Sequence, residues 1–389
     1  MKKVKKMKVA VITGTRAEYG LLKLILSKIR DSSKLELKLI VTGTHLCSAF
    51  GNTYKDIEAD GFEISYKVDI LLGSDSPAAI AKSMGLCTTS FAQVFQQMQP
   101  DIVLFLGDRF ELLSAASAAL PFNILLAHIA GGEVTEGAMD DQIRHALTKL
   151  SHLHFPCSDD YAENLKKMCE EPWRIHNAGH PCLELIRHTK LISKKELFRK
   201  YNLNPSKKLF LVTLHSTTLN SMATEKSEAK AFFNVLKKYS NANIIITHPN
   251  ADTNGHLILN EINEIKKLQN VHSIPNLGSL NYLSLMKVCD LVIGNSSSGL
   301  VEGPFFKVPV INYGERQKGR LKASNIIDAK PNEKDFNMAI EMALYNANYR
   351  NALKKTRSIY GDGNTSDIIV KVLESTEKNE LLLKKKFIR

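Results

Sequence analysis

Short runs of hydrophobic residues alternate along this chain with longer segments in which hydrophobic and polar positions are mixed. In the first half, each run ends near a glycine or a small polar residue and leads into a turn and a helix-like segment. Runs of this kind cover residues 8–14, 35–43, 101–108, 123–132, 153–158 and 174–180. Because strands buried on both faces read as continuous apolar runs, the alternation predicts a parallel sheet covered by helices.

The second half repeats the pattern after a polar, helix-like segment at residues 183–208. Its apolar runs cover residues 208–215, 243–250, 271–276, 290–297 and 308–314. The pattern therefore predicts an α/β protein of two doubly wound, Rossmann-like domains with an active-site cleft between them. We place the first domain at residues 1–185, the second at 186–363, and a carboxyl-terminal helix and basic tail at 364–389.

Length and composition fit this picture. A chain of 389 residues exceeds the size at which one core normally keeps growing, and 44% hydrophobic with 24% charged residues is typical of globular proteins. No apolar stretch approaches the roughly 18 residues of a membrane span, and the amino terminus lacks a signal-peptide core, so we expect a cytoplasmic protein. The six cysteines are scattered without zinc-site spacing, which predicts reduced, buried thiols and no metal site.

The net charge of +12 lies mostly at the chain ends. Residues 1–8 contribute +5 and residues 378–389 contribute +4, so nine of the twelve charges are terminal. Terminal lysine runs are usually solvated tails, and the interior has no basic helix interleaved with aromatic residues. We therefore expect neither a nucleic acid nor a membrane as partner.

The sequence GNSSSGLVE at residues 294–302 points to an anion site. The apolar run before it predicts a strand. We expect a turn at Asn295 to Ser298 and the beginning of a helix at Gly299. A helix amino terminus beside several hydroxyls suits a phosphate or diphosphate. The alternative is that Ser297 or Ser298 only caps the helix.

Three further side chains extend this anion site to a nucleotide site. Glu302, expected in the first turn of the helix, would repel phosphate but could accept hydrogen bonds from a ribose diol. Arg316 and Arg320 follow the next strand and can donate charge-assisted hydrogen bonds to phosphate. Together these features predict a nucleoside diphosphate site.

At the amino end, the segment GTRAEYG is again a turn between a strand and a helix. It is neither a Gly-x-Gly-x-x-Gly motif nor a Walker loop. Gly14 permits the turn, and Arg16 would lie at the helix start, facing the cleft. The alternative for Arg16 is an exposed surface arginine.

Acidic residues gather after the strands in the middle of the first domain. Asp108 and Arg109 follow one strand, and the next is followed by a group that could exchange protons with a bound sugar. This group comprises His128, Glu133, Glu136, Asp140, Asp141 and Arg144. The alternative is that Asp140 and Asp141 are only stabilising first-turn acids of a helix, with Arg144 one turn on.

Two histidines follow strands in the second domain. His215 ends one predicted strand, while His248 and Asn250 follow the next. A lone histidine at a strand end is more often structural, but a position beside the proposed diphosphate favours a functional His215.

Several segments together resemble the hydrolysing UDP-N-acetylglucosamine 2-epimerases of bacterial sialic acid synthesis. They are GTRAEYG, TGTHL followed by FGNT, GDRFE, GGEVTEG, DDQIRHALTKLSHLHF, GNSSSGLVE and GERQKGR. The resemblance implies a glycosyltransferase-B-like fold without a cofactor, a carboxyl-terminal helix that returns to the first domain, and a homodimer. It also implies elimination of UDP to a 2-acetamidoglycal, followed by hydration to N-acetylmannosamine.

For the first domain, the resemblance places Arg16 and Arg109 on the substrate side. It makes Asp108 and Asp140 acid/base candidates, to which our own interpretation adds Glu133 and Arg144 as catalytic candidates.

For the second domain, the resemblance assigns contacts to each part of the nucleotide. The residues are His215 near the diphosphate, Asn250 at the nucleotide, Ser296 and Ser297 at the phosphates, Glu302 at the ribose, and Arg316 near the leaving group. We count His215 among the catalytic candidates.

One position departs from the family pattern. Some relatives have a glutamate where this chain has Ala130. Either Glu133, His128 or a water molecule takes over its role, or that role is not general.

Four other functions remain open. Non-hydrolysing epimerases share the fold, but they carry a glutamine- and arginine-rich segment where this chain has TGTHLCSAFGNT. Similar hydrolysing enzymes act on UDP-N,N'-diacetylbacillosamine instead of UDP-N-acetylglucosamine. A UDP-sugar glycosyltransferase would need an acceptor, and a non-catalytic nucleotide-sugar sensor would show no turnover.

Overall fold

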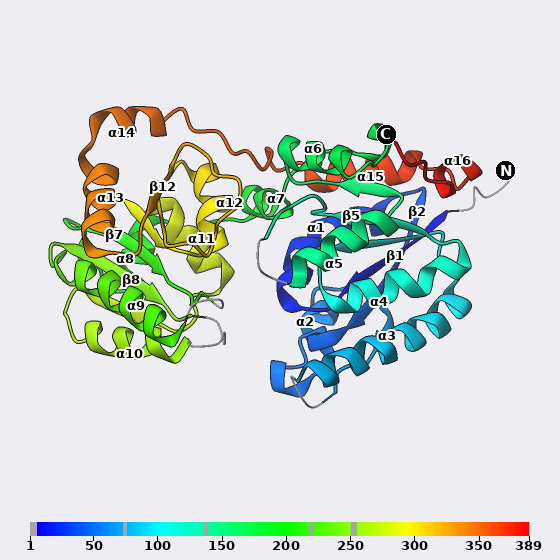
Figure 1. The fold of residues 1–389 in the computed structure, drawn as a ribbon, viewed down its shortest axis with the longest axis horizontal. Helices are drawn as coiled ribbons and strands as arrows, with labels where there is room; N and C mark the ends of the chain where they lie inside the picture. Colours follow the sequence, from blue (N-terminus) through cyan, green and yellow to red (C-terminus); the bar gives the residue numbers. More distant parts are fainter. Residues whose placement is uncertain (1–5, 73–75, 136–138, 218–220, 250–254, 389) are drawn as a thin grey trace. The chain divides into compact units, whose positions relative to one another are not determined.

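The structure is a computed structural model that describes residues 6–72, 76–135, 139–217, 221–249 and 255–388. The chain divides into two compact units. Unit 1 comprises residues 1–187 and 360–389, and unit 2 comprises residues 188–359. Figure 1 shows a sheet with helices on both of its faces in each unit.

Unit 1 contains a six-stranded parallel sheet with the order β3-β2-β1-β4-β5-β6. Its strands are β1 (Met7–Thr13), β2 (Leu35–Thr42), β3 (Ile64–Val68), β4 (Ile102–Leu106), β5 (Leu125–Ile129) and β6 (Leu153–Phe155). Its helices are α1 (Arg16–Asp31), α2 (Tyr54–Ala59), α3 (Pro77–Met98), α4 (Phe110–Ala119), α5 (Met139–Leu150), α6 (Asp159–Lys167), α15 (Thr365–Ser375) and α16 (Glu380–Leu383). Helix α7 (Pro181–His188) ends at the division between the units.

Unit 2 has the same strand order read from the other edge, β12-β11-β10-β7-β8-β9, and all pairs are parallel. Its strands are β7 (Lys208–Thr213), β8 (Ala242–Thr247), β9 (Val271–Ile274), β10 (Leu291–Gly294), β11 (Val310–Tyr313) and β12 (Ile326–Ala329). Its helices are α8 (Lys194–Lys200), α9 (Met222–Lys237), α10 (Gly255–Ile265), α11 (Gly278–Val288), α12 (Ser297–Phe306), α13 (Glu333–Tyr345) and α14 (Ala347–Leu353). Two doubly wound, Rossmann-type sheets therefore confirm the predicted fold class.

The sequence pattern missed one edge strand in each sheet. Strands β3 and β12 bury only part of their side chains, so neither forms the continuous apolar run that marks a central strand. The strand predicted at 174–180 is wrong, since that segment forms only one bridge, from His154 to Ile175.

The end of the chain packs on unit 1. Lys28 of α1 lies 2.5 Å from Asp367 of α15, and the buried guanidinium of Arg174 donates to the carbonyls of Leu381 and Leu382. The Nζ of Lys385 lies 2.7 Å from the buried carboxylate of Glu170. The expectation that the terminal lysines are all solvated is therefore wrong for Lys385, because Glu170 offers it a buried counter-charge.

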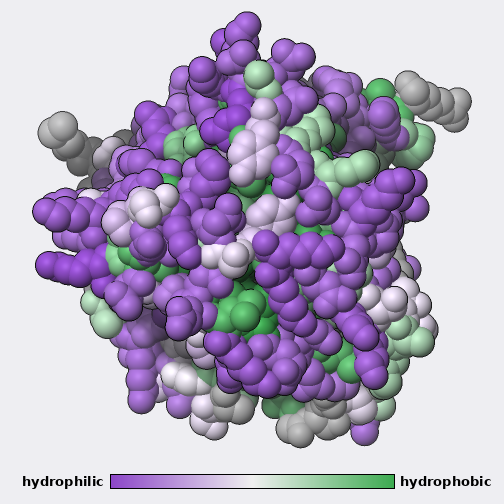
Figure 2. Space-filling view, turned by 90° about the vertical axis from the view of Figure 1, so that its left-hand side faces the viewer, coloured by the Kyte–Doolittle hydropathy of each residue, from purple (hydrophilic) through white to green (hydrophobic). Residues whose placement is uncertain are grey.

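The surface of the protein is largely polar on the face that Figure 2 shows. That face is mostly hydrophilic, with hydrophobic residues in small separate areas. No helix in the described ranges is long and apolar enough to cross a membrane. All six cysteines are free thiols, but Cys47, Cys169 and Cys289 are only partly buried, so the expectation of six buried thiols is half correct.

At Gly294, the last residue of β10, the backbone lies so close to that of β7 that a side chain there should destabilise the fold. Gly294 has φ +139°, and a Cβ there would overlap the carbonyl oxygen of Thr213 on β7. We expect Gly294→Ala to lower the free energy of unfolding by about 3 kcal/mol or more, because the backbones must separate. Urea unfolding measures this loss.

Gly278→Ala is the matched control. Gly278 also has a positive φ, +67°, but a Cβ there meets nothing within 4 Å. Its cost should be only about 1 to 2 kcal/mol, the strain of alanine in that backbone region. Equal losses in the two variants would contradict the steric explanation for Gly294.

Candidate functional site

Each sheet has one point at which the strand order reverses, between β1 and β4 in unit 1 and between β7 and β10 in unit 2. Ligands of open α/β sheets bind beyond the carboxyl ends of the strands at this point. The polar residues singled out in the sequence follow these strands or the neighbouring strands β5, β8 and β11.

In unit 2, Asn295 connects the ends of β7 and β10. Its side-chain Oδ1 accepts from the backbone N–H of His215, and its Nδ2 donates to the carbonyl of His215, both at 2.8 Å. Its own N–H donates to the carbonyl of Thr213 at 3.2 Å. The buried Asn295 side chain thus continues the pairing of the two strands past their last residues and fixes the backbone of His215.

The backbone carbonyl of Asn295 binds the loop that follows β11. Arg316 Nη1 donates to it at 3.1 Å and the buried Gln317 Nε2 at 2.9 Å. Arg316 therefore lies beside the turn, as the sequence predicted. The roles of Asn295 and Gln317 were missed, although both stand inside the quoted motifs GNSSSGLVE and GERQKGR.

Helix α12 begins earlier than predicted. Ser296 is its N-cap, with a hydroxyl that accepts from the N–H of Ser298, and the exposed Ser297 is the first helical residue. A Cβ on Gly299 would lie 2.9 Å from Val310 Cγ1, and one on Gly303 would lie 2.7 Å from Val310 Cγ2. These two glycines let α12 lie close to β11, so its positive end is held directly at the end of the sheet.

Glu302 lies in the second turn of α12, and the expectation of the first turn is wrong because the helix starts at Ser297. Its Oε2 is buried and has no hydrogen-bond partner among the described residues. Burial raises the pKa of Glu302 to about 8. A buried acceptor without a partner is costly unless a ligand supplies donors.

Two histidines of unit 2 were also predicted as site residues. His215 is buried and stands two residues after the end of β7. His248 follows β8, and its Nε2 lies 2.9 Å from Ser273 Oγ. Arg320 is half-buried in the loop after β11. Asn250 lies outside the described residues.

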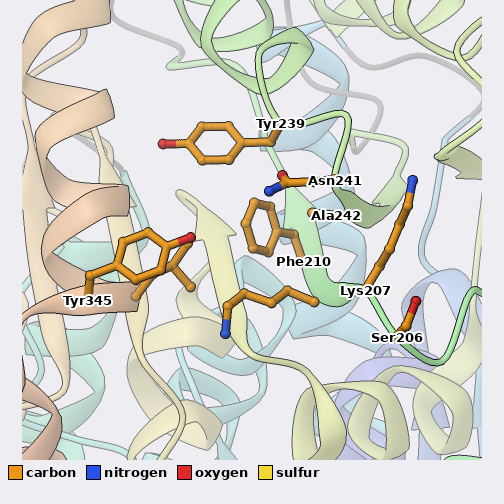
Figure 3. A pocket seen from close by; sticks show the side chains of 9 residues that line it. Ser206, Lys207, Phe210, Tyr239, Asn241, Ala242 and Tyr345 are labelled. Carbon is orange, nitrogen blue, oxygen red and sulfur yellow. The ribbon is translucent and has the colours of Figure 1, made fainter.

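A cavity of about 350 Å³ lies at the opposite end of the unit 2 sheet. Residues 206–208 and 241–242, which line it, precede or begin β7 and β8, and Figure 3 shows the rings of Phe210, Tyr239 and Tyr345 around it. The cavity therefore lies at the amino ends of the strands. None of the predicted site residues lines it.

In unit 1, two buried carboxyl groups surround the turn after β1. Glu18 completes a capping box, since its Oε2 accepts from the N–H groups of Gly14 and Thr15 at 2.8 and 3.0 Å. Glu111 of α4 lies so close that a Cβ on Gly14 would overlap its Oε1. Burial and the charge of Glu111 raise the pKa of Glu18 to about 7, although Arg109 opposes the shift.

Glu111 also orients Arg109. Arg109 Nε lies 2.5 Å from Glu111 Oε1, whereas Glu111 Oε2 is buried and has no partner in the described parts of the chain. Sequence reasoning selected Arg109 and missed Glu111. The only sequence signal was its place in GDRFE, where an acid stands in the first turn of a helix.

Arg16 is the first residue of α1 and is exposed, with its Nε 3.7 Å from Asp56 Oδ2. Arg16 therefore lies at the start of the helix, as predicted, and it is also an exposed surface arginine, as the alternative stated.

Asp108, Asp141 and Arg144 form one ionic group. The buried guanidinium of Arg144 donates to Asp108, to Asp141 Oδ1 at 3.1 Å and to the carbonyl of Glu133 at 3.0 Å. Asp141 Oδ1 also accepts from the N–H of Thr135 at 2.7 Å. Arg144 thus connects α5 to the segments that follow β4 and β5. Asp141 is a first-turn acid of α5, as the structural alternative to a catalytic role stated.

Asp140 lies beside this group in the first turn of α5. Its side chain is largely exposed, but the surrounding protein still removes water from the carboxyl group, and the negative charge of Asp108 repels a second one. Both effects raise the pKa of Asp140, although Arg144 and Arg109 act against them. Two neighbouring carboxyl groups in different environments are typical of acid/base sites.

Glu133 is buried, and its carboxylate lies near Cys157 and His180. His128 is fully buried, with Nε2 2.7 Å from the carbonyl of Gly107. Burial lowers the pKa of His128 to about 3, so it stays neutral near pH 7 and is a poor substitute for a glutamate at position 130. Ala130 itself has φ +67° and donates its N–H to the carbonyl of Phe155.

Comparison with known proteins identifies relatives along nearly the whole chain. The profile of the UDP-N-acetylglucosamine 2-epimerase family matches residues 27–374. The "GDP/UDP-N,N'-diacetylbacillosamine 2-epimerase (hydrolyzing)" of Campylobacter jejuni is 44% identical over 85% of this chain and 86% of its own length. The "UDP-N,N'-diacetylbacillosamine 2-epimerase (hydrolyzing)" of Legionella pneumophila is 34% identical over 97% of this chain and 98% of its own length.

A solved structure agrees with the fold. The UDP-GlcNAc 2-epimerase of Neisseria meningitidis superposes with a TM-score of 0.81 at 19% identity, over 95% of this chain and all of that one. The resemblance stated from the motifs is therefore confirmed: the chain belongs to the UDP-N-acetylglucosamine 2-epimerase family and matches its hydrolysing members.

Proposed function

We propose that this enzyme hydrolyses a UDP-linked 2-acetamido sugar and inverts C2. A base removes the C2 proton while the C1–O bond breaks and its electron pair leaves with UDP, which gives a 2-acetamidoglycal. Water then adds its oxygen to C1, and a proton reaches C2 from the opposite face. The observation that carries the proposal is the turn of Asn295 and Ser296, which holds the start of α12, the buried carboxyl of Glu302 and Arg316 around one place.

The proposal assigns the nucleotide to unit 2. Ser296 and Ser297 bind the diphosphate at the positive end of α12, while Arg316 stabilises the charge that develops on the leaving group. Glu302 accepts hydrogen bonds from the ribose diol. His215, whose backbone is fixed by Asn295, contacts the substrate near the diphosphate. Asn250 remains a predicted nucleotide contact.

The proton chemistry is assigned to unit 1. Asp140 is the base for the C2 proton, because its raised pKa makes it a stronger base than an ordinary aspartate. Asp108, held by Arg144, transfers a second proton and raises the pKa of Asp140 by repulsion. Arg109 and Arg16 contact the substrate. Glu133 remains a candidate for the hydration step.

We propose UDP-N,N'-diacetylbacillosamine as the preferred substrate, which reverses the order given by the sequence alone. The named relatives with 44% and 34% identity both carry that sugar in their names. UDP-N-acetylglucosamine, and with it a place in sialic acid synthesis, is the second candidate because the family as a whole is described by it. A homodimer and a cytoplasmic location stay predictions.

The reaction can be tested by offering the two UDP-sugars together, without an acceptor, in D₂O. We expect UDP and a free sugar inverted at C2, with deuterium at C2, and faster consumption of the diacetylbacillosamine substrate. NMR spectroscopy follows both sugars and the label. Recovery of an intact UDP-sugar inverted at C2 would instead indicate a non-hydrolysing epimerase, and no release of UDP without an acceptor would indicate a glycosyltransferase.

Asp140 and Asp108 can be distinguished by pH profiles. We expect Asp140→Asn to lower kcat by at least about a hundredfold through loss of the base. Asp108→Asn should also slow turnover, and it should move the acidic limb of kcat/KM to lower pH, because the charge that raises the pKa of Asp140 is gone. Asp160→Asn, an exposed first-turn acid of α6, is the control. An unshifted acidic limb in Asp108→Asn would contradict this coupling.

Glu302 makes UDP binding depend on pH. A ribose diol donates better to an ionised carboxylate, so the affinity for UDP should rise as pH increases through about 8 and then level off. Above that pH, Glu302→Gln should weaken binding by roughly tenfold to a hundredfold, as for hydrogen bonds to a charged group. Calorimetric titration of both proteins and of the exposed-site control Glu264→Gln measures this. The same pH dependence in Glu302→Gln would refute the role.

A further inference from the structure

Three side chains with different donor atoms converge in unit 1. Glu133 follows β5, Cys157 follows β6, and His180 precedes α7. One ligand atom from each lies within 4.8 Å of those of the other two. Glu133 and Cys157 are buried and His180 is partly exposed, so the cluster is enclosed by protein but has an open side.

The backbone holds these three segments together. Strands β5 and β6 are parallel neighbours, and the N–H of Ala130 donates to the carbonyl of Phe155 at 3.0 Å. The N–H of Ala178 donates to the carbonyl of Pro156 at 3.1 Å, and that of His180 to the carbonyl of Tyr360 at 2.8 Å. The ligand-bearing segments are therefore placed by the sheet and its flanking loops.

Side-chain contacts add to this positioning. The carbonyl of Glu133 accepts from the buried Arg144 at 3.0 Å. Gly132 has φ +82°, and a Cβ there would overlap the carbonyl of Tyr161, so the turn before Glu133 is tightly packed. His180 Nδ1 lies 2.9 Å from Cys182 Sγ, a neighbour that can orient the ring.

The donor set determines which cation would fit. A thiolate, an imidazole and a carboxylate are ligands of Zn²⁺, and three protein ligands with an open fourth position are typical of zinc sites that bind a water molecule or another ligand. Mg²⁺ and Ca²⁺ prefer oxygen ligands throughout. The distances between the ligand atoms require only a small closure around one ion.

We propose that Glu133, Cys157 and His180 form a binding site for one zinc-like divalent cation. Binding displaces the thiol proton of Cys157 into solvent, as for any zinc thiolate. Sequence spacing could not reveal the site, because its ligands come from three separate segments and form no local motif. Binding itself does not depend on the proposed reaction, although an ion on Glu133 would withdraw that carboxylate from proton transfer.

The test uses the full chain, treated with a chelator and kept reduced, and titrated with Co²⁺ and with Zn²⁺. We expect one Zn²⁺ per chain by elemental analysis after gel filtration, and a thiolate-to-cobalt charge-transfer band. Cys157→Ser should abolish the band, and Glu133→Gln and His180→Gln should each weaken Zn²⁺ binding at least about tenfold. Cys169→Ser, which removes a partly exposed thiol outside the cluster, should change neither readout.

Two further measurements keep the test decisive. Circular dichroism and UDP binding by unit 2 establish that each variant is folded, and the near-isosteric Glu133→Gln preserves volume if Cys157→Ser fails to fold. Binding of Zn²⁺ that is equal in wild type, Glu133→Gln and His180→Gln would overturn the site. The absence of any cobalt–thiolate band in wild type would overturn it as well.

Discussion

The side-chain amide of Asn295 is the interaction on which the proposed nucleotide site of unit 2 depends. Parallel strands β7 and β10 end at the reversal of strand order, where their backbone groups would lose their partners. The Asn295 side chain replaces those partners by bonding both backbone groups of His215, and the backbone carbonyl of Asn295 accepts from Arg316 and Gln317. One buried residue thereby fixes the histidine through its side chain, and the arginine and the loop after β11 through its backbone carbonyl.

The two sheets share one strand order but present different chemistry at the same topological position. In unit 2 the reversal point carries serine hydroxyls, amides and a helix amino terminus, which suit an anion. In unit 1 it carries carboxyl groups bound by Arg109 and Arg144, of which Glu111 is buried and Asp108 is partly exposed. Burial raises the pKa of the neighbouring carboxyl groups of Glu18 and Asp140, so we propose that the same fold supplies charge stabilisation in one unit and proton transfer in the other.

The sequence predicted most of this arrangement because central strands, turns and helix starts leave strong local signals. Apolar runs located ten of the twelve strands, but β3 and β12 escaped because edge strands are half-exposed. The motif GNSSSGLVE predicted a turn and a helix start after β10, yet it did not show that Ser296 is the cap or that Glu302 lies in the second turn.

Residues that act through another residue were harder to find. Glu111, Gln317 and the bridging role of Asn295 depend on contacts between segments far apart in the chain, and the cluster of Glu133, Cys157 and His180 depends on three such segments. A single sequence carries no signal for contacts of that kind.

A crystal structure with bound UDP tests the central claim most directly. We expect the diphosphate at Ser296 and Ser297, the ribose diol on Glu302, and Asn295 still bonded to the backbone of His215. UDP bound at the other end of the sheet, among Phe210, Tyr239 and Tyr345, or with Glu302 left without a partner, would contradict it.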